Sequence, residues 1–323
     1  MKKSRILIPI ALFSLLLSHC QDPSVRFDPL TDEIDDDINI VVPDVIEPED
    51  SIDDPHQMGV DCSSSNRNAS IELIEITEIP IDLPTNHDLS EDMPPVRSQG
   101  NQGSCVAWAT TYYMKSYQEK TQHKYDYVSF EDVMSPAFVY NQIKASDHCN
   151  AGSAVVNALE LLKEQGVNNW KDFPYSDTQC SNLPNDDQLV VASQNKIKSY
   201  FLVGIPESNT DENYTLTNLI KTLVYQNNPI IVTLAFRDLI FENRDGELIA
   251  TSFSQNPIGG CGHAVLIVGY DNEKNAFKIV NSWGTGWGNE GYGWVHYNFF
   301  LSENDSDFEQ GLSGAYIAYD EDE

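Results

Sequence analysis

Basic residues are scarce in this chain of 323 residues. It has 19 lysines and arginines against 50 aspartates and glutamates, which gives a formal net charge of -31. This balance argues against a nucleic-acid partner, because binding phosphates needs basic patches. The acidic excess indicates either a surface suited to solubility and salty water or a negative field that attracts cationic substrates.

Closely spaced metal ligands are also missing. The six cysteines and seven histidines include no Cys-x-x-Cys or His-x-x-x-His pair, and such pairs are typical of zinc sites. The chain also shows no internal repeat. The sequence therefore predicts no metal and no other cofactor.

The N-terminus has an apolar run that is too short to span a bilayer comfortably. Three basic residues precede this run at residues 6–17. The "LLSHC" that follows ends at Cys20 and resembles a bacterial lipoprotein signal, in which the cysteine is lipidated and becomes the new N-terminus. His19 departs from the small residue usual at its position, and an ordinary secretory signal is the alternative. Either signal takes the protein out of the cytoplasm.

Residues 21–70 lack any sustained helical or alternating pattern. They hold 14 acidic and 2 basic residues and are interrupted by prolines. Such a segment buries too little apolar surface to offset its ordering entropy, so we predict a flexible tether. The alternative is that this segment covers the active site, because residues 38–42 are briefly strand-like. The folded domain is expected over residues 71–323, with a first strand at residues 71–79.

The folded domain changes character along its length. Its first part predicts helices at residues 105–119, 135–145 and 153–166. Its second part predicts one more helix at residues 214–228, then strands within residues 229–236, 263–283, 291–300 and 314–320. We therefore expect an α+β fold with a helical lobe (about residues 98–185), a sheet lobe (about residues 186–323 plus 71–97) and a cleft between them.

The stretch "QGNQGSCVAWA" places a single cysteine, Cys105, at the start of a predicted helix. The helix dipole and the free backbone N–H groups there stabilise a thiolate and lower its pKa from about 8.5. Gln99, six residues earlier, can aim its side-chain amide at the oxyanion that forms when a thiolate attacks a carbonyl.

Two further stretches supply partners for this cysteine. "GGCGHAVLIVGY" places His263 at the start of a strand, and "NSWGTGWGNEGYGW" places Asn281 at the end of another, with Trp283 close behind. An asparagine carbonyl accepts the imidazole N–H and sets its tautomer, and a tryptophan shields that bond from water. The four polar residues together make a nucleophile, a base, an orienting group and an oxyanion donor.

These stretches resemble the conserved blocks of papain-family (C1) cysteine peptidases, over about residues 83–320, and most closely the bacterial secreted type. The resemblance implies a papain-like fold with a helical left lobe and a β-barrel-like right lobe. It also implies that Cys105 is the nucleophile, His263 the general acid and base, Asn281 the orienting group and Trp283 its shield. Gln99 and the Cys105 backbone N–H would form the oxyanion hole.

"CNAGSA", at residues 149–154, is similar to the family's Cys-Asn-Gly-Gly stretch. The resemblance implies that substrate binds along Asn150 and Gly152 on one side of the cleft and Gly262 on the other. Ala151 replaces a family glycine, Gln102 a disulfide cysteine and Val106 a tryptophan. The long helical pro-segment of the eukaryotic enzymes is missing, so we expect no conventional zymogen.

Four cysteines remain after Cys20 and Cys105, and four allow three pairings. We favour a disulfide between Cys149 and Cys180, because both flank the helix expected at residues 153–166 and the loop after it. That choice leaves Cys62 with Cys261, a bridge that would hold the N-terminal segment near the active site.

We expect a monomer that hydrolyses peptide bonds of protein or peptide substrates through a thioester. It would be lipid-anchored, as a bacterial lipoprotein on the cell surface or the periplasmic face, or else secreted. One rival is a catalytically silent binding module, which has no physical need for all four polar residues. Another is acyl or amine transfer, which is disfavoured because thiol transglutaminases usually have Asp in place of Asn281.

Overall fold

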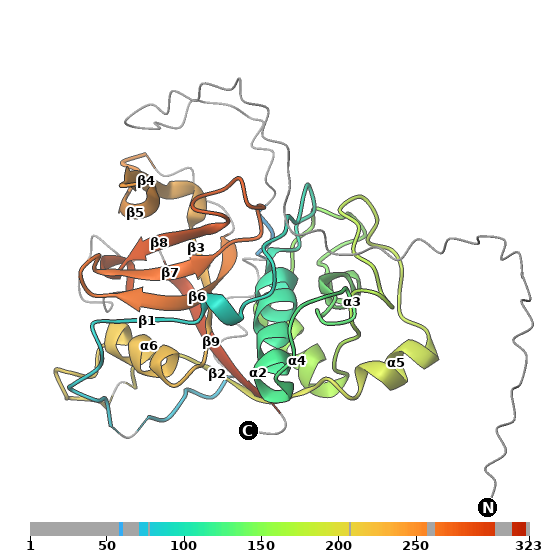
Figure 1. Ribbon diagram of the computed structural model, residues 1–323, viewed down its shortest axis with the longest axis horizontal. Helices are drawn as coiled ribbons and strands as arrows, with labels where there is room; N and C mark the ends of the chain where they lie inside the picture. The colour runs from blue at the N-terminus through green and yellow to red at the C-terminus, as the bar shows by residue number, and fades with distance from the viewer. Residues whose placement is uncertain are drawn as a thin grey trace, which may run out of the picture.

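The computed structural model describes residues 58–60, 71–76, 78–206, 208–256, 262–300 and 312–320. Figure 1 shows most of the helices on one side of the molecule, the sheet with one further helix beside it on the other, and a long helix between them. One continuous hydrophobic core joins the two parts. The expected α+β class is therefore confirmed.

The long central helix begins at Cys105. It consists of α1 (Cys105–Ala107), a π-helical stretch η3 (Trp108–Lys115) and α2 (Ser116–His123). Every residue from 102 to 119 is buried, as expected of a helix enclosed on all sides. Lys124, in the left-handed conformation at φ 56°, ends the helix four residues later than the sequence predicted.

Two further helices complete most of the helical lobe. In α3 (Pro136–Ile143) the Ser135 side chain accepts a hydrogen bond from the Phe138 N–H and Pro136 occupies the first turn, as predicted. In α4 (Val155–Glu164) the chain leaves the helix through Gly166, at φ +82°.

The sequence predicted one of the two remaining helices. α6 (Leu216–Tyr225) begins at Thr215, whose side chain caps it. α5 (Asp186–Ala192) was not predicted, although Asn185 and Gln188 form a reciprocal capping box at its start. None of the helices within the described residues is both long and apolar enough to cross a membrane.

The strands form one sheet in the order β2-β9-β3-β6-β7-β8-β5-β4, with β1 also paired to β6. Every described pairing is antiparallel except that of β5 with β8. The bounds are β1 (Asn86–Asp88), β2 (Ile197–Leu202), β3 (Ile230–Leu234), β4 (Leu239–Arg244), β5 (Glu247–Phe253), β6 (His263–Asp271), β7 (Ala276–Val280), β8 (Tyr292–His296) and β9 (Leu312–Asp320). The short 3-10 turns are η2 (Ser90–Asp92), η4 (Phe236–Asp238) and η5 (Tyr297–Phe300).

The sheet is open rather than a closed barrel. β2 and β4 lie at the two ends of the sheet, and within the described residues they do not pair with each other. β2 packs against α4, while the β4–β5 hairpin joins the sheet only through a short parallel contact with β8. Because its edges meet different neighbours, the right lobe differs from the barrel-like form that the resemblance implied. The β4–β5 hairpin itself was not predicted.

The strand expected at residues 71–79 is wrong. Among the described residues of this stretch, only Leu73 forms a β-bridge, with Leu202 of β2. Two backbone hydrogen bonds flank the bridge, from Ile74 N to Leu202 O and from Leu202 N to Glu72 O, each 2.9 Å long. Alternating apolar and acidic residues suit a half-buried strand, but this stretch bridges the β2 edge of the sheet at only one described position.

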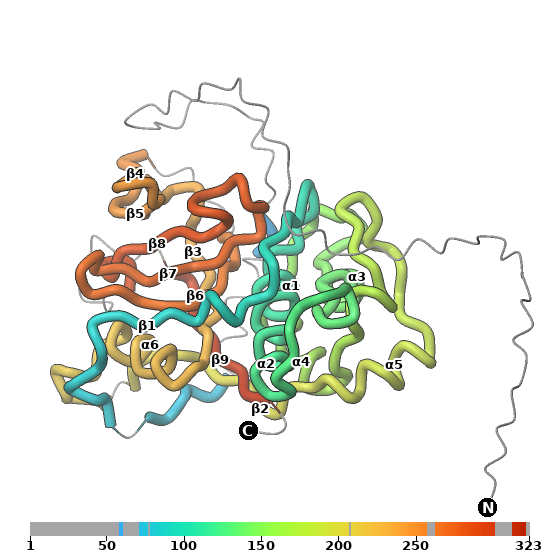
Figure 2. Tube along the Cα trace, viewed as in Figure 1, coloured from blue at the N-terminus to red at the C-terminus, as the bar shows by residue number. Residues whose placement is uncertain are grey.

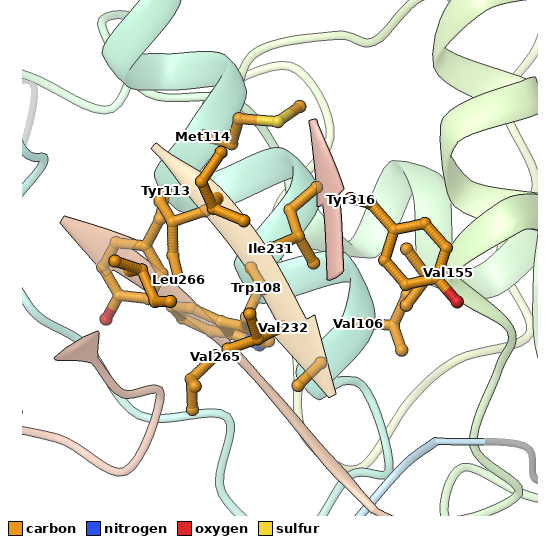
Figure 3. Packing of buried hydrophobic residues seen from close by; sticks show 14 of the residues in the cluster. Val106, Trp108, Tyr113, Met114, Val155, Ile231, Val232, Val265, Leu266 and Tyr316 are labelled. Atoms are coloured by element: carbon orange, nitrogen blue, oxygen red, sulfur yellow. The ribbon is translucent and has the colours of Figure 1, made fainter. Parts of the chain in front are cut away.

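The core lies where the central helix crosses the sheet. Figure 3 shows Trp108, Tyr113 and Met114 of the helix against Ile231 and Val232 of β3 and Val265 and Leu266 of β6. Farther along the helix, the buried Lys115 ammonium lies 2.7 Å from an Asp320 oxygen and 2.6 Å from a Glu119 oxygen. This ion cluster fastens β9 to the central helix.

The start of the central helix lies at the junction of the two lobes. In Figure 2 the chain runs beside β6 as β1 and then turns into α1. α1 contacts β6 on one side and α3 and α4 on the other. A residue at the first helical position therefore faces both lobes.

Candidate active site

Cys105 is the first residue of the central helix, at the junction of the lobes. The backbone N–H of Ala264 donates to its Sγ at 3.4 Å. Because Ala264 follows His263 in β6, this contact brings the thiol to the strand position that carries the imidazole. Cys105 is the only free cysteine among the described residues.

His263 and Asn281 meet at the ends of neighbouring strands, β6 and β7. His263 Nε2 lies 2.7 Å from Asn281 Oδ1. Since an amide oxygen only accepts, the proton of this bond sits on Nε2. Proton exchange with the thiol then falls to Nδ1. The structure thus brings together the nucleophile, base and orienting residue named from the sequence.

Aromatic rings enclose the His263–Asn281 bond. The Trp283 ring centroid lies 4.6 Å from that of His263, at an interplanar angle of 34°. The Phe236 ring meets His263 edge-on, at 5.1 Å and 67°. His263 and Asn281 are both 0% exposed. Exclusion of water strengthens a polar contact of this kind. Phe236 was not named from the sequence, which predicted it as the last residue of a strand over residues 229–236, whereas the structure places it in the η4 turn.

Gln99 is held by two hydrogen bonds that orient its amide. The Ser282 hydroxyl donates to Gln99 Oε1 at 2.5 Å, and Gln99 Nε2 donates to the Gln102 carbonyl at 2.8 Å. With its oxygen tied to Ser282, the NH₂ group faces the loop that leads to Cys105. Ser282 was not named from the sequence, although it follows Asn281 directly.

Tyr175 is a second supporting residue that the sequence analysis missed. Its hydroxyl donates to the Gln99 carbonyl at 2.8 Å and lies 2.7 Å from Ser104 Oγ. Ser104 immediately precedes Cys105, so one phenol holds both ends of the loop. No local signal could have found this residue, because it lies 70 or more positions away in the chain.

The predicted fall in the pKa of Cys105 is wrong for this conformation. Burial raises the pKa of the thiol to about 11, and backbone N–H groups, first Ala264 and then Gly59, offset only part of that rise. A helix start favours the thiolate, but complete removal of solvent disfavours any charge more strongly. The buried conformation therefore holds a thiol.

The predicted substrate-binding residues lie on two sides of Cys105. Gly152, at φ +73°, and Gly262 are buried, whereas Asn150 is exposed. A disulfide joins Cys149 to Cys180, with Cα atoms 5.5 Å apart, and it anchors the strand of chain that carries Gly152. Cys20, Cys62 and Cys261 lie outside the described residues, so lipidation and the second pairing stay predictions.

Residues 58–60 lie between Gly152 and Gly262. The Ser153 N–H donates to the Gly59 carbonyl at 2.7 Å, and the Val60 N–H donates to the Gly262 carbonyl at 3.2 Å. These three residues belong to the segment predicted as a flexible tether, with a cover for the active site as the alternative. The strand-like stretch at residues 38–42 that suggested a cover lies outside the described residues.

Comparison with known proteins agrees with this geometry. Residues 83–310 match the model of the family described as "Papain family cysteine protease". Germination-specific cysteine protease 1 of Arabidopsis thaliana is 28% identical over 214 residues, which are 65% of this chain and 50% of that protein. A cathepsin L-like proteinase of Fasciola hepatica is 30% identical over 206 residues, 61% of this chain and 55% of that protein. The chain thus spans about half the length of these relatives.

Solved structures share the fold. Xylellain, a cysteine protease from Xylella fastidiosa, has a TM-score of 0.63 at 23% identity, covering 82% of this chain and 96% of its own. The bromelain protease from Ananas comosus, in complex with the E64 inhibitor, has a TM-score of 0.51 at 19% identity. That match covers 74% of this chain and all of bromelain.

Proposed function

The chain belongs to the papain family of cysteine proteases, and from this premise we propose that it hydrolyses peptide bonds with Cys105 as the nucleophile. The observation that carries the proposal is the 2.7 Å bond from His263 Nε2 to Asn281 Oδ1, with Ala264 holding the Cys105 thiol beside the same strand end. A thiol, an imidazole and an orienting amide from both lobes converge there.

The first half of the reaction forms a thioester. Cys105 gives its proton to His263 Nδ1, and the thiolate attacks the substrate carbonyl carbon. The Gln99 amide and the Cys105 backbone N–H stabilise the oxyanion that develops. The intermediate then collapses as the C–N bond breaks, and His263 returns the proton to the leaving amine.

The second half restores the enzyme. His263 takes a proton from water, and the resulting hydroxide attacks the thioester carbonyl. The C–S bond breaks, the acid leaves, and the proton on His263 returns to the Cys105 sulfur. Asn281 holds the imidazole through both halves, and Trp283 keeps water from the bond between them.

We propose protein or peptide substrates that bind in extended form along Gly152 and Gly262. The Gly262 carbonyl and the N–H of Ser153, which follows Gly152, offer backbone groups on either side of the thiol, as their bonds to Val60 and Gly59 illustrate. The side chain of Asn150 is exposed at the rim. No side chain needs to be recognised for such binding, so it suits many peptide sequences.

We propose an extracytoplasmic location, with lipid anchoring through Cys20 and secretion as the alternative. The Cys149–Cys180 disulfide supports an oxidising compartment. The N-terminal "LLSHC" supports the lipid anchor. We also propose that the protein is a monomer. Mass spectrometry of the mature protein, produced in a bacterial host, tests the anchor by showing whether a lipid modifies Cys20.

The E64 inhibitor found with bromelain is a direct probe of the proposed chemistry. The expected result is one adduct on Cys105, located by intact mass and peptide mapping, and loss of that adduct in His263→Ala. Peptide hydrolysis that survives in Cys105→Ala would overturn the proposal. Release of amide rather than acid when a free amine is added would indicate acyl transfer instead.

A further inference from the structure

Tyr113 is a buried tyrosine of the central helix whose hydroxyl reaches the candidate active site. The residue is 1% exposed and lies in the core between the helix and the sheet (Figure 3). Its hydroxyl donates a hydrogen bond to the backbone carbonyl of Asn281, at 2.9 Å. Because the Asn281 side chain is bonded to the His263 imidazole, a phenol on the helix of Cys105 holds the residue that orients the proposed base.

The Asn281 carbonyl needs such a partner because it lies just past the end of a strand. β7 ends at Val280, and among the described residues no backbone N–H donates to the Asn281 carbonyl. The other main-chain group of Asn281, its N–H, donates to the Gly291 carbonyl at 3.0 Å. A buried carbonyl without a partner is costly. The Tyr113 hydroxyl therefore supplies a bond that the sheet does not.

The Tyr113 hydroxyl has a second partner, the backbone N–H of Arg97, from which it accepts a hydrogen bond. Arg97 precedes Gln99 by two positions, and the Gln99 N–H donates to the Ser282 carbonyl at 2.8 Å. The hydroxyl thus lies where the segment that carries the proposed oxyanion donor meets the segment that carries Asn281. One side chain of the central helix contacts both segments.

The hydroxyl keeps its proton for these contacts. Burial raises the pKa of Tyr113 well above its ordinary value, and the neighbouring Tyr112 raises it further. A neutral phenol donates one hydrogen bond and can also accept one, as a carbonyl on one side and an N–H on the other require. The hydroxyl therefore stays protonated at the pH values at which a cysteine and a histidine exchange a proton.

The helix around Tyr113 departs from α-helical geometry. Tyr113 lies in the π-helical stretch η3, and π-helical turns are rare and frequently lie at functional sites. Their i→i+5 hydrogen bonds widen the turn and so change the direction of the side chains. Since η3 continues α1, which begins at Cys105, a contact made by Tyr113 fixes the thiol and the sheet lobe relative to each other.

We propose that Tyr113 is a positioning residue, which holds Asn281, and through it the His263 imidazole, in register with Cys105. Tyr113 does not touch the reacting atoms and acts only through the Asn281 backbone. Its effect on hydrolysis rests on the proposed function, whereas its effect on the imidazole does not. The two effects are therefore measured separately.

Tyr113→Phe in the full chain removes the hydroxyl and keeps the ring. Its matched control is Tyr112→Phe, because Tyr112 is 0% exposed, adjoins Tyr113 and donates to the Pro95 carbonyl at 2.7 Å. Each variant loses one buried bond to a backbone carbonyl, so their melting temperatures are expected to fall alike. An effect common to both variants reports stability alone.

The ring proton of His263 reports positioning without requiring catalysis. This proton lies on Nε2 and is bonded to Asn281 Oδ1 at a heavy-atom distance of 2.7 Å, so NMR is expected to show a downfield signal that exchanges slowly with water. In Tyr113→Phe we expect exchange at least about tenfold faster and an upfield shift, because a loosely held Asn281 lets the bond open. Tyr112→Phe is expected to change neither. An unchanged proton in Tyr113→Phe would overturn the positioning role.

Peptide hydrolysis by the unaltered chain and the two variants separates the two proposals. We expect kcat to fall about tenfold in Tyr113→Phe, with KM nearly unchanged and a shifted pH profile, and less than about twofold in Tyr112→Phe. An equal fall in both variants would overturn the positioning role and leave the proposed function standing. No hydrolysis by any of the three proteins, with the His263 proton altered in Tyr113→Phe alone, would overturn the proposed function and support the positioning of the imidazole.

Discussion

The two lobes hold their halves of the active site in different ways. The helical lobe places Cys105 through its backbone, at the start of a buried helix that follows the glycine-containing loop before it. The sheet lobe places His263 through side chains, namely Asn281, Trp283 and Phe236. The proposed nucleophile is thus positioned mainly by the backbone fold, and the proposed base mainly by side-chain contacts that single substitutions can weaken.

Removal of the nucleophile is expected to have the largest effect. Cys105→Ala leaves the imidazole in place but no group to form the thioester. We expect kcat/KM for a peptide substrate to fall at least about 10⁴-fold. The melting temperature serves as the control for folding. Activity within tenfold of the unaltered chain would contradict the assignment of this half of the site.

The link between the lobes is expected to be the next most sensitive feature. Lys115→Met leaves the buried carboxylates of Glu119 and Asp320 without the ammonium that lies between them. Such a loss costs about 3–5 kcal/mol of unfolding free energy. Denaturant unfolding measures it, with Lys120→Met as the matched control, because its partner Asp92 is half exposed. Equal stabilities would show that the ion cluster does not hold the lobes together.

The pH dependence of the thiol sharpens the contrast between a covered and an uncovered site. The pKa of Cys105 is about 11 because burial disfavours the thiolate, so labelling of the unaltered chain by iodoacetamide, a small thiol reagent, is expected to rise up to that pH. In Gly59→Ala the added Cβ would lie 2.0 Å from the Gly103 carbonyl oxygen, so residues 58–60 must move away from Cys105. Exposure to water then returns the pKa of the thiol toward about 8.5, its ordinary value. The midpoint of the labelling profile therefore moves down. An unchanged or higher midpoint would show that the cover does not cause the raised pKa.

Side-chain positioning of the base is tested by Asn281→Ala. The imidazole loses the acceptor at 2.7 Å that sets its tautomer. We expect kcat to fall about 10²-fold while KM changes little. The pH profile of kcat is expected to shift as well, which a purely structural role would not cause. A change in KM alone would place Asn281 in substrate binding instead.

The smallest effect is expected in the helical lobe, where the backbone positions Cys105. Tyr175→Phe removes the hydroxyl that bonds the Gln99 carbonyl and Ser104. Each such bond contributes about 1 kcal/mol, so kcat is expected to fall only severalfold. Tyr125→Phe, which loses a single bond to the Asp132 carbonyl, is the control. A loss as large as that of Asn281→Ala would remove the distinction between the lobes.

Local signals predicted much of the fold. Ser135 with Pro136 marked the start of α3, and Gly166 marked the end of α4, because capping depends on neighbours in the chain. The β4–β5 hairpin escaped prediction, and so did the single bridge at Leu73. Both depend on which edge of the sheet is open, which neighbouring residues in the chain do not encode.

In the proposed active site too, some residues were predicted from local sequence and others are revealed only by the tertiary structure. Cys105, His263 and Asn281 were named from short motifs, because each lies at the end of an element where a side chain reaches a cleft. Gln99 was named from its place six residues before Cys105. Tyr175 carries no motif, so only its position in the fold reveals its bonds. The pKa of Cys105 was predicted in the wrong direction, because a helix start is visible in the sequence and burial by a distant segment is not.

The order and chemistry of the residues were therefore readable from the chain alone, since nucleophile, base and helix caps depend on residue type and near neighbours. Occupation of the cleft by residues 58–60 emerged only from tertiary structure. The Gly59 contacts with Gly103 and Ser153 join positions far apart in the chain. Contacts of that kind arise from packing, and packing decides whether a thiol at a helix start meets water or another strand.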